Sequence, residues 1–182
     1  MINQPYSTRN IKTMELSRSE KARQYFKEGY NCAQSTVLAF EDILPIPRKE
    51  LLMLASGFGG GMAGMHEVCG AVTGAFMVID LLYGFDSPKP GQAKMELYEH
   101  LRSNAEEFRA VHGSILCRDL ISLRMEKNPD GTPKHDLRCA DLVSYVVEDI
   151  EAQIYTSYIA HEVKVVNEAE KLKKEMKDDS DR

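Results

Sequence analysis

A glycine-rich segment near the middle of the chain most constrains how it can fold. Seven of the twelve glycines lie between Gly57 and Gly74, and residues 57–64 read GFGGGMAG. Glycine adopts positive φ angles that other residues avoid, lets main chain approach other groups closely, and weakens any helix or strand that contains it. We therefore expect residues 57–64 to form a loop between helices, with its main chain close to a bulky or charged group.

The sequence before this loop carries three signals for the start of a helix. Ser17 and Glu20 have the spacing of a capping box, in which two residues satisfy each other's backbone N–H groups at the first turn. Asn31 and Gln34 repeat this spacing. Pro47 fits the first turn of a third helix, because its missing N–H is not needed there.

Four more helices are expected after the loop. They cover residues 66–84, residues 91–113, the segment that follows Ser114, and the segment that follows Asp136. No alternation of apolar and polar residues persists long enough to predict a sheet. The predicted fold is all-α, a single-domain bundle of about six to seven helices with a glycine-rich loop.

The chain length fits one domain with an extension at each end. We predict an N-terminal extension over residues 1–13, a helical domain over residues 14–166, and a tail over residues 167–182 in which 11 of 16 residues are charged. The total of 182 residues is within the usual range for one compact domain.

Charge and hydropathy exclude several classes of partner. Lys and Arg number 23 against 28 Asp and Glu, and the resulting net charge of −5 predicts no general attraction to nucleic acid. No apolar stretch reaches the ~18–20 residues of a membrane span, and the N-terminal sequence lacks the apolar core of a signal peptide. We therefore expect a cytoplasmic protein whose thiols stay reduced.

The four cysteines all fall near predicted helix starts. They are Cys32, Cys69, Cys117 and Cys139. The first follows Asn31, the predicted N-cap, and the second falls within two turns of the glycine-rich loop. The third and fourth come three residues after Ser114 and Asp136, which places both in the third helical position. None of them forms a C-x-x-C pair, so neither a zinc ribbon nor a thioredoxin-type motif is present.

A helix start gives a cysteine an unusual environment. The free N–H groups and the positive end of the helix dipole favour the thiolate, which is the form that attacks disulfides and binds metals. If the four helix starts converge, the cysteines can hold one metal ion or an iron–sulfur cluster. The alternative is four scattered cysteines that pack as small hydrophobic residues.

The glycines and a nearby histidine are candidates for the same site. Gly59, Gly61 and Gly64 match G-x-G-x-x-G, but a dinucleotide site needs a preceding strand and the segment before this loop reads as helix. We prefer close approach of the main chain at Gly59, Gly60, Gly61 and Gly70 to a bound anionic group, with tight helix packing as the alternative for Gly70.

His66 lies three residues before Cys69. At this position it can donate to a cysteine sulfur, replace one ligand, or serve only as a cap or surface group.

Taken together, these residues resemble one known family. The segment GFGGGM from Gly57 and the segment CGAVTG from Cys69 resemble the pattern of the C_GCAxxG_C_C family. The segment YNCAQ supplies the leading cysteine, Cys32, and Cys117 and Cys139 supply the two trailing ones. The resemblance covers roughly residues 20–150.

The resemblance implies a redox-active protein without an established reaction. The family is similar to the cluster-carrying part of split-Soret cytochromes c, which implies iron–sulfur binding, although this sequence has no haem-attachment motif. We therefore predict one site formed by all four cysteines, with an iron–sulfur cluster as the preferred cofactor and electron transfer to a redox partner protein as the function. The alternatives are a thiol–disulfide oxidoreductase, in which one cysteine such as Cys69 attacks as the thiolate and another resolves the mixed disulfide, and a zinc site with four cysteine ligands in a structural or carrier role. The helix after Asp136 has an apolar face that fits either a homodimer or ordinary core packing.

Overall fold

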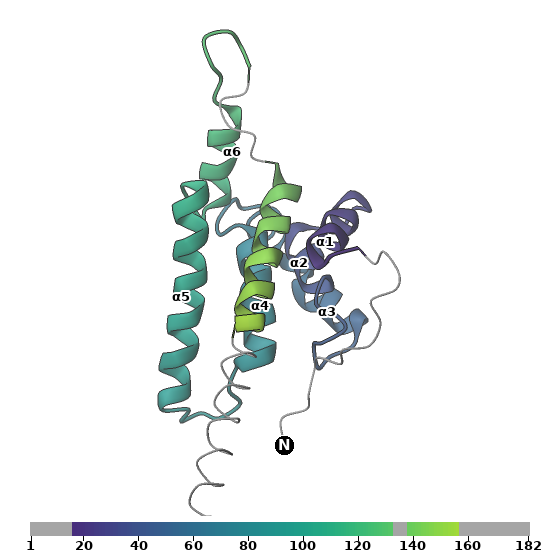
Figure 1. Cartoon of the computed structure of the whole chain (residues 1–182), viewed down its shortest axis with the longest axis vertical. Coiled ribbons are helices and arrows are strands. Elements are labelled where there is room, and N and C mark those ends of the chain that lie inside the picture. Colours follow the sequence, from purple (N-terminus) through teal and green to yellow (C-terminus); the bar gives the residue numbers. More distant parts are fainter. Residues whose placement is uncertain (1–15, 133–137, 157–182) are drawn as a thin grey trace, which may run out of the picture. The chain divides into compact units, whose positions relative to one another are not determined.

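The computed structural model describes residues 16–132 and 138–156. Its named helices are α1 (Arg18–Lys27), α2 (Cys32–Leu38), α3 (Arg48–Ala55), the 3-10 helix η1 (Ser56–Phe58), α4 (Gly70–Tyr83), α5 (Gln92–His112) and α6 (Cys117–Met125) (Figure 1). A further helix covers residues 139–156. Over these described ranges the structure holds no strand, only one isolated bridge between Val68 and Leu116. The predicted all-α fold is confirmed.

The chain divides into two compact units, residues 1–148 and residues 149–182. The first contains all the named helices and the start of the helix at 139–156, and the described part of the second, residues 149–156, continues that helix. The predicted extension 1–13 and tail 167–182 lie outside the described residues. The predicted domain boundaries therefore stay predictions.

Both predicted capping boxes are present. The Ser17 side chain accepts from the Glu20 amide at the start of α1, and Asn31 and Gln34 make the same reciprocal pair at the start of α2. Pro47, however, is the N-cap of α3 and not a residue of its first turn. These local signals set where the first two helices begin.

Two glycines let α2 and α4 pack closely against each other. A Cβ atom on Gly74 would lie 2.7 Å from the Thr36 Cβ and 3.0 Å from the Ala33 carbonyl oxygen. On Gly70 a Cβ would lie 2.8 Å from the Cys32 Cβ. The tight packing considered for Gly70 is therefore present. It brings the start of α4 beside the start of α2.

The core forms around this pair of helices. Phe40, just after α2, is fully buried, as are Val72 and Val78 of α4. Phe108 of α5 is also buried, and α5 ends at Gly113, whose left-handed φ of 85° closes the helix. In the described part of the chain, no helix has the length and apolar character needed to cross a bilayer.

Candidate four-cysteine site

Each cysteine lies at the first position of a helix or directly before it. Cys32 and Cys117 are the first residues of α2 and α6, and Cys69 is the N-cap of α4. Cys139 is the first residue of the helix at 139–156. The placement of all four cysteines near helix starts is as predicted.

The predicted register of the last two cysteines is wrong. Ser114 does not cap α6, because its hydroxyl accepts from the Leu116 amide and donates to the Asp119 carboxylate, and Leu116 is the N-cap. Cys117 is therefore the first helical residue and not the third. Asp136 lies outside the described residues, and the helix begins only at Cys139. Both thiols consequently stand closer to the helix N-terminus than expected.

A short antiparallel pairing joins the starts of α4 and α6. The Cys69 amide donates to the Ile115 carbonyl at 2.8 Å, and the Cys117 amide donates to the Glu67 carbonyl at 2.6 Å. The Arg118 amide also donates to the His66 carbonyl, at 3.0 Å. Residues 66–69, predicted to be helical, lie before the start of α4, because this pairing uses their backbone groups. The pairing thus places Cys69 and Cys117 on two directly bonded chain segments.

The start of α2 is tied to the segment that leads into the glycine-rich loop. The Asn31 side-chain amide donates to the Ser56 carbonyl at 3.0 Å and reaches the Ala55 carbonyl at 3.4 Å. Gly59 lies against the same side chain, since a Cβ there would be 2.6 Å from the Asn31 Cβ. Asn31 thus caps α2 and fixes the loop next to Cys32.

Contacts with α1 and α5 hold the helix that carries Cys139. Arg23 of α1 forms an ion pair with Asp141 and donates to the Ser144 hydroxyl at 3.0 Å. On the other side, Tyr145 packs edge-on against Phe108, with ring centroids 6.0 Å apart. These contacts place the first two turns of this helix beside α1 and α5.

The four cysteines line one cavity. Its other walls are Gly70, Leu120, Ile121, Arg124 and Leu142, and its volume is about 20 Å³. A cavity needs roughly 10–15 Å³ measured in this way to hold one water molecule. The side chains as they stand therefore leave room for an atom-sized guest.

Sequence reasoning missed Arg124, the charged side chain of this wall. Cys117, Leu120, Ile121 and Arg124 are spaced so that they share one face of α6. The guanidinium Nη1 donates to the Cys139 sulfur at 3.8 Å. Arg124 follows Cys117 by seven residues, or two helical turns, and this spacing could have indicated that the two residues share a face of the helix.

Cys32 and Cys139 interact directly. The Cys32 thiol donates a hydrogen bond to the Cys139 sulfur, which lowers the pKa of Cys139 to about 6, with a further contribution from Arg124, against the opposing effect of burial. The same hydrogen bond, together with burial, raises the pKa of Cys32. In the metal-free protein, Cys139 is therefore the thiol most readily ionised, and Cys32 keeps its proton.

Cys69 and Cys117 are less easily ionised than Cys139. Cys69 is only 4% exposed, and burial raises its pKa to about 11 despite hydrogen bonds from the amides of Ala71 and Val72. Burial also raises the pKa of Cys117, as does the nearby Cys139, while Arg124 lowers it. Metal binding would have to displace protons from these thiols.

The glycine-rich loop folds back on itself. The amides of residues 62–67 donate to carbonyls of residues 57–62, so this part of the loop uses its own backbone donors. Gly60 and Gly61 have left-handed φ angles of 59° and 67°. A Cβ on Gly61 would lie 2.6 Å from the Cys117 Cβ, whereas Gly60 lies against Gly64. Two of the predicted glycines, Gly61 and Gly70, therefore lie against cysteines. Cofactor binding by Gly59, Gly60, Gly61 and Gly70 stays a prediction.

His66 lies at the edge of the site. Its Nδ1 is 3.8 Å from the Cys117 sulfur, and the residue is exposed with a left-handed φ of 59°. The structure thus brings His66 to one of the cysteines, as one of the predicted roles requires. Whether it binds a cofactor stays a prediction.

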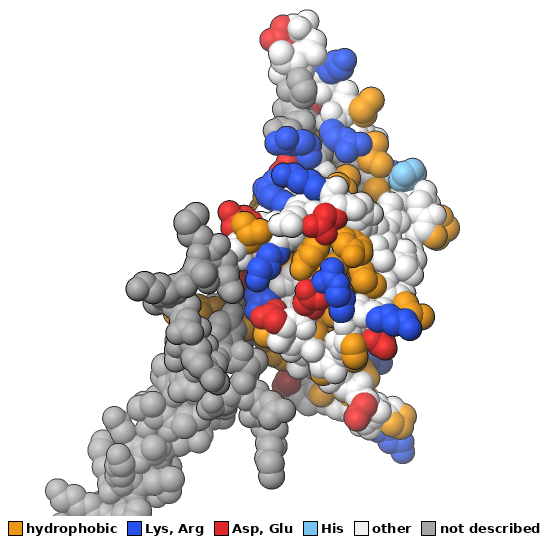
Figure 2. Space-filling model, turned by 90° about the vertical axis from the view of Figure 1, so that its right-hand side faces the viewer, with side chains coloured by type: hydrophobic (Ala, Val, Ile, Leu, Met, Phe, Trp, Pro, Cys, Tyr) orange, Lys and Arg blue, Asp and Glu red, His pale blue; other side chains and the backbone are white. Residues whose placement is uncertain are grey.

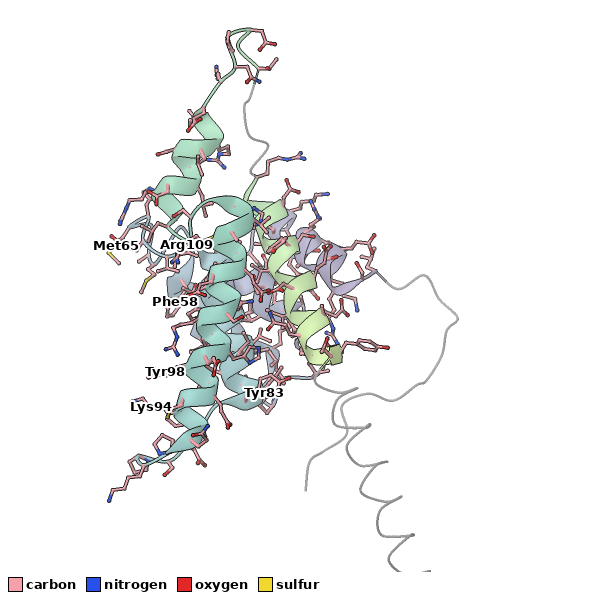
Figure 3. The ribbon with its side chains drawn as sticks, turned by 60° about the vertical axis from the view of Figure 1, so that its left-hand side comes forward. Phe58, Met65, Tyr83, Lys94, Tyr98 and Arg109 are labelled. Atoms are coloured by element: carbon pink, nitrogen blue, oxygen red, sulfur yellow. The ribbon has the colours of Figure 1, made fainter. Side chains whose placement is uncertain are left out.

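The figures show the surroundings of the site at the surface. In Figure 3, Met65, the residue directly after the glycine-rich loop, lies toward the end of α5 that carries Arg109, away from Lys94 at its other end. Figure 2 shows several Lys and Arg side chains toward the end of the molecule that carries α6.

Within residues 16–132 and 138–156, no group of three or more His, Cys, Asp or Glu side chains is arranged to hold a metal ion.

An all-α protein with four cysteines around one cavity agrees with the comparisons with known proteins. Residues 30–153 match the family described as "Putative redox-active protein (C_GCAxxG_C_C)". The chain belongs to this C_GCAxxG_C_C family, as the sequence resemblance predicted.

One relative is an "Uncharacterized protein" from Archaeoglobus fulgidus. It is 28% identical over 148 residues, which cover 73% of this chain and 93% of the relative. No solved structure matches the chain.

Proposed function

We propose that the four cysteines bind one iron–sulfur cluster and that the protein transfers single electrons through it. The observation that carries this proposal is the common cavity lined by Cys32, Cys69, Cys117 and Cys139. A dithiol enzyme needs two cysteines at its site, whereas four thiolates are the usual ligand set of a cluster. The use of all four cysteines favours the cluster.

The residues around the cavity suit a group held by thiolates. Each cysteine lies at or directly before a helix start, where the dipole favours negative charge by about 0.3–1 kcal/mol, and Arg124 adds a positive charge. Gly61 and Gly70 have no side chains, so the main chain approaches two of the cysteines closely. The chemistry of the donor set therefore fits the cluster, and the cysteine side chains would have to move apart to admit it, because the cavity of about 20 Å³ holds only an atom-sized guest.

The chain itself would perform three tasks. The four thiolates would hold the cluster, which supplies one-electron redox chemistry when bound. Leu120, Ile121 and Leu142 form an apolar wall of the cavity, and such a wall limits access of water and tunes the potential of a metal site. The backbone pairing between residues 66–69 and 115–118 would hold two of the ligands in place.

A second function, thiol–disulfide exchange, is favoured by the hydrogen-bonded pair Cys32 and Cys139. The Cys139 thiolate would attack a substrate disulfide, forming a mixed disulfide and releasing one substrate thiolate. Cys32 would then lose its proton and attack the Cys139 sulfur, so that a Cys32–Cys139 disulfide forms and the second substrate thiolate leaves. Two electrons would pass from the protein to the substrate. Cys139 suits the attacking role better than Cys69, because burial raises the pKa of Cys69 to about 11.

Zinc is the alternative occupant of a four-thiolate site. Zn²⁺ has no redox chemistry of its own, so the redox-active description of the family favours iron. For either redox function we propose a cytoplasmic location, in keeping with four free thiols. The electron donor or acceptor would be a separate redox protein.

The proposal is tested by purifying the full chain without oxygen. Iron, sulfide and zinc are measured on one sample, together with the visible absorption spectrum before and after dithionite. We expect iron with matching sulfide and an absorption band that bleaches on reduction. Zinc alone at one per chain, or metal-free protein, would refute the cluster.

Variants then show whether the four cysteines act together. Each single cysteine-to-serine variant should lose most of the iron and sulfide, whereas Ser122→Ala, on an exposed position of α6, should keep both. Retention of the cluster in two or more of the cysteine variants would contradict a site formed by all four. Metal-free protein that forms a Cys32–Cys139 disulfide would support the second function instead.

A further inference from the structure

Arg124 is the one Lys or Arg side chain among the described residues that line the four-cysteine cavity. It lies two turns after Cys117 on the same face of α6. Its Nη1 donates to the Cys139 sulfur at 3.8 Å. The guanidinium therefore contacts the cysteine that starts another helix, on the face of α6 that begins with Cys117.

Among the described residues, the neighbouring arginines, unlike Arg124, form ion pairs with carboxylates. Arg118 forms an ion pair with Glu67 at 2.9 Å, and Arg138 forms one with Asp141 at 3.0 Å. In the described part of the chain, no carboxylate forms an ion pair with Arg124. Its positive charge is thus directed at sulfur, and no acidic side chain among the described residues neutralises it.

We propose that Arg124 is a positioning residue that offsets the negative charge of the thiolates through Cys139 and so raises the reduction potential of the site. This inference rests on the proposed electron-transfer function. Reduction adds negative charge to a site that already carries thiolates. A guanidinium stays protonated at all accessible pH values, and in a partly buried setting its attraction to nearby negative charge is weakly screened. It therefore stabilises the reduced form more than the oxidised form.

Three full-length variants test this role in the loaded protein. Arg124→Gln removes the charge, Arg124→Lys keeps it, and Arg102→Gln removes a charge from an exposed position on α5 that does not line the cavity. The potential is measured by a spectroscopic redox titration under anaerobic conditions. For Arg124→Gln we expect an equilibrium constant of one-electron reduction about tenfold smaller, a potential about 59 mV lower.

The lysine variant and the control distinguish charge from packing. Arg124→Lys should restore most of the potential, because lysine places a positive charge near the same sulfur. Arg102→Gln should leave the potential unchanged. An unchanged potential in Arg124→Gln, or equal changes in all three variants, would overturn the inference.

A second measurement uses the metal-free protein and does not depend on the cluster. The rate at which iodoacetamide alkylates Cys139 is followed by mass spectrometry at one fixed pH. Without the Arg124 charge less thiolate is present, so Arg124→Gln should react several-fold more slowly than wild type and Arg102→Gln at the wild-type rate. Equal rates in all proteins would overturn the inference.

The two measurements separate the inference from the proposed function. A wild-type protein that binds no cluster, but shows slower alkylation in Arg124→Gln, would refute the cluster and support the role of the Arg124 charge. A wild-type protein that binds the cluster, with the same potential in Arg124→Gln, would support the cluster and refute the role of Arg124.

Discussion

Gly61 offers the sharpest test of how the glycine-rich loop meets the cysteines. The change is Gly61→Ala, and the matched control is Gly64→Ala in the same loop. Both glycines have left-handed φ angles, 67° and 75°, but only at Gly61 would an added Cβ meet other atoms. A Cβ at Gly61 would be 2.6 Å from the Cys117 Cβ and 2.9 Å from the Glu67 amide nitrogen. At Gly64 no neighbouring heavy atom lies within 4 Å of an added Cβ.

The expected magnitudes follow from these two situations. An L-residue in the left-handed region costs about 1–2 kcal/mol, and this cost applies to both variants. Overpacking costs about 1–3 kcal/mol more, and this cost applies only to Gly61→Ala, because the backbone of residues 66 and 67 cannot simply rotate away. We therefore expect Gly64→Ala to lose about 1–2 kcal/mol of unfolding free energy and Gly61→Ala about 2–5 kcal/mol.

Urea unfolding of the metal-free protein, followed by circular dichroism in a reducing buffer, measures both losses. Iron loading of the two variants is then compared. Gly61→Ala should also bind less iron, since its Cβ displaces Cys117, and Gly64→Ala should load like wild type. Equal losses of stability in the two variants would refute the close approach of Gly61 to Cys117.

Two further predictions concern the caps and the thiols. Asn31→Ala should lower the free energy of unfolding by about 1–2 kcal/mol, because the helix cap is lost. It should also reduce iron loading, because Asn31 donates a hydrogen bond to the Ser56 carbonyl. Ser17→Ala should lower the free energy of unfolding by about 1 kcal/mol without affecting the iron content. In the metal-free protein, alkylation of Cys139 should rise with pH around its pKa of about 6, and Cys69 should react later than Cys139 because burial raises the pKa of Cys69 to about 11. Mass spectrometry of the labelled peptides gives this order, and early labelling of Cys69 would contradict the burial argument.

The parts of the fold that depend on neighbouring residues could be predicted from the sequence. The capping boxes at Ser17 and Asn31 lie within one turn of the chain, so their residue types alone indicate a helix start. The stop at Gly113 is equally local. These signals, together with the absence of alternating patterns, were enough to predict an all-α protein with cysteines at helix starts.

Features that depend on distant contacts could not be predicted. Ser114 has the residue type of a cap, but the pairing of residues 66–69 with 115–118 moves the start of α6 to Cys117. The same pairing delays the start of α4 to Gly70. Arg124 was missed because an arginine on a helix is most often a solvated surface residue, and only the convergence of the four helix starts gives it a place beside sulfur.

The spread of the four cysteines along the chain affects when the site can be assembled during synthesis. Three of them leave the ribosome well before Cys139, which opens the last described helix. Until that helix emerges and its Ser144 reaches Arg23 of α1, the cavity lacks one of its walls and one of its thiols. A chain that stops short of residue 139 cannot complete the proposed four-thiolate site, so cofactor loading would mark the chains that have been made past this point.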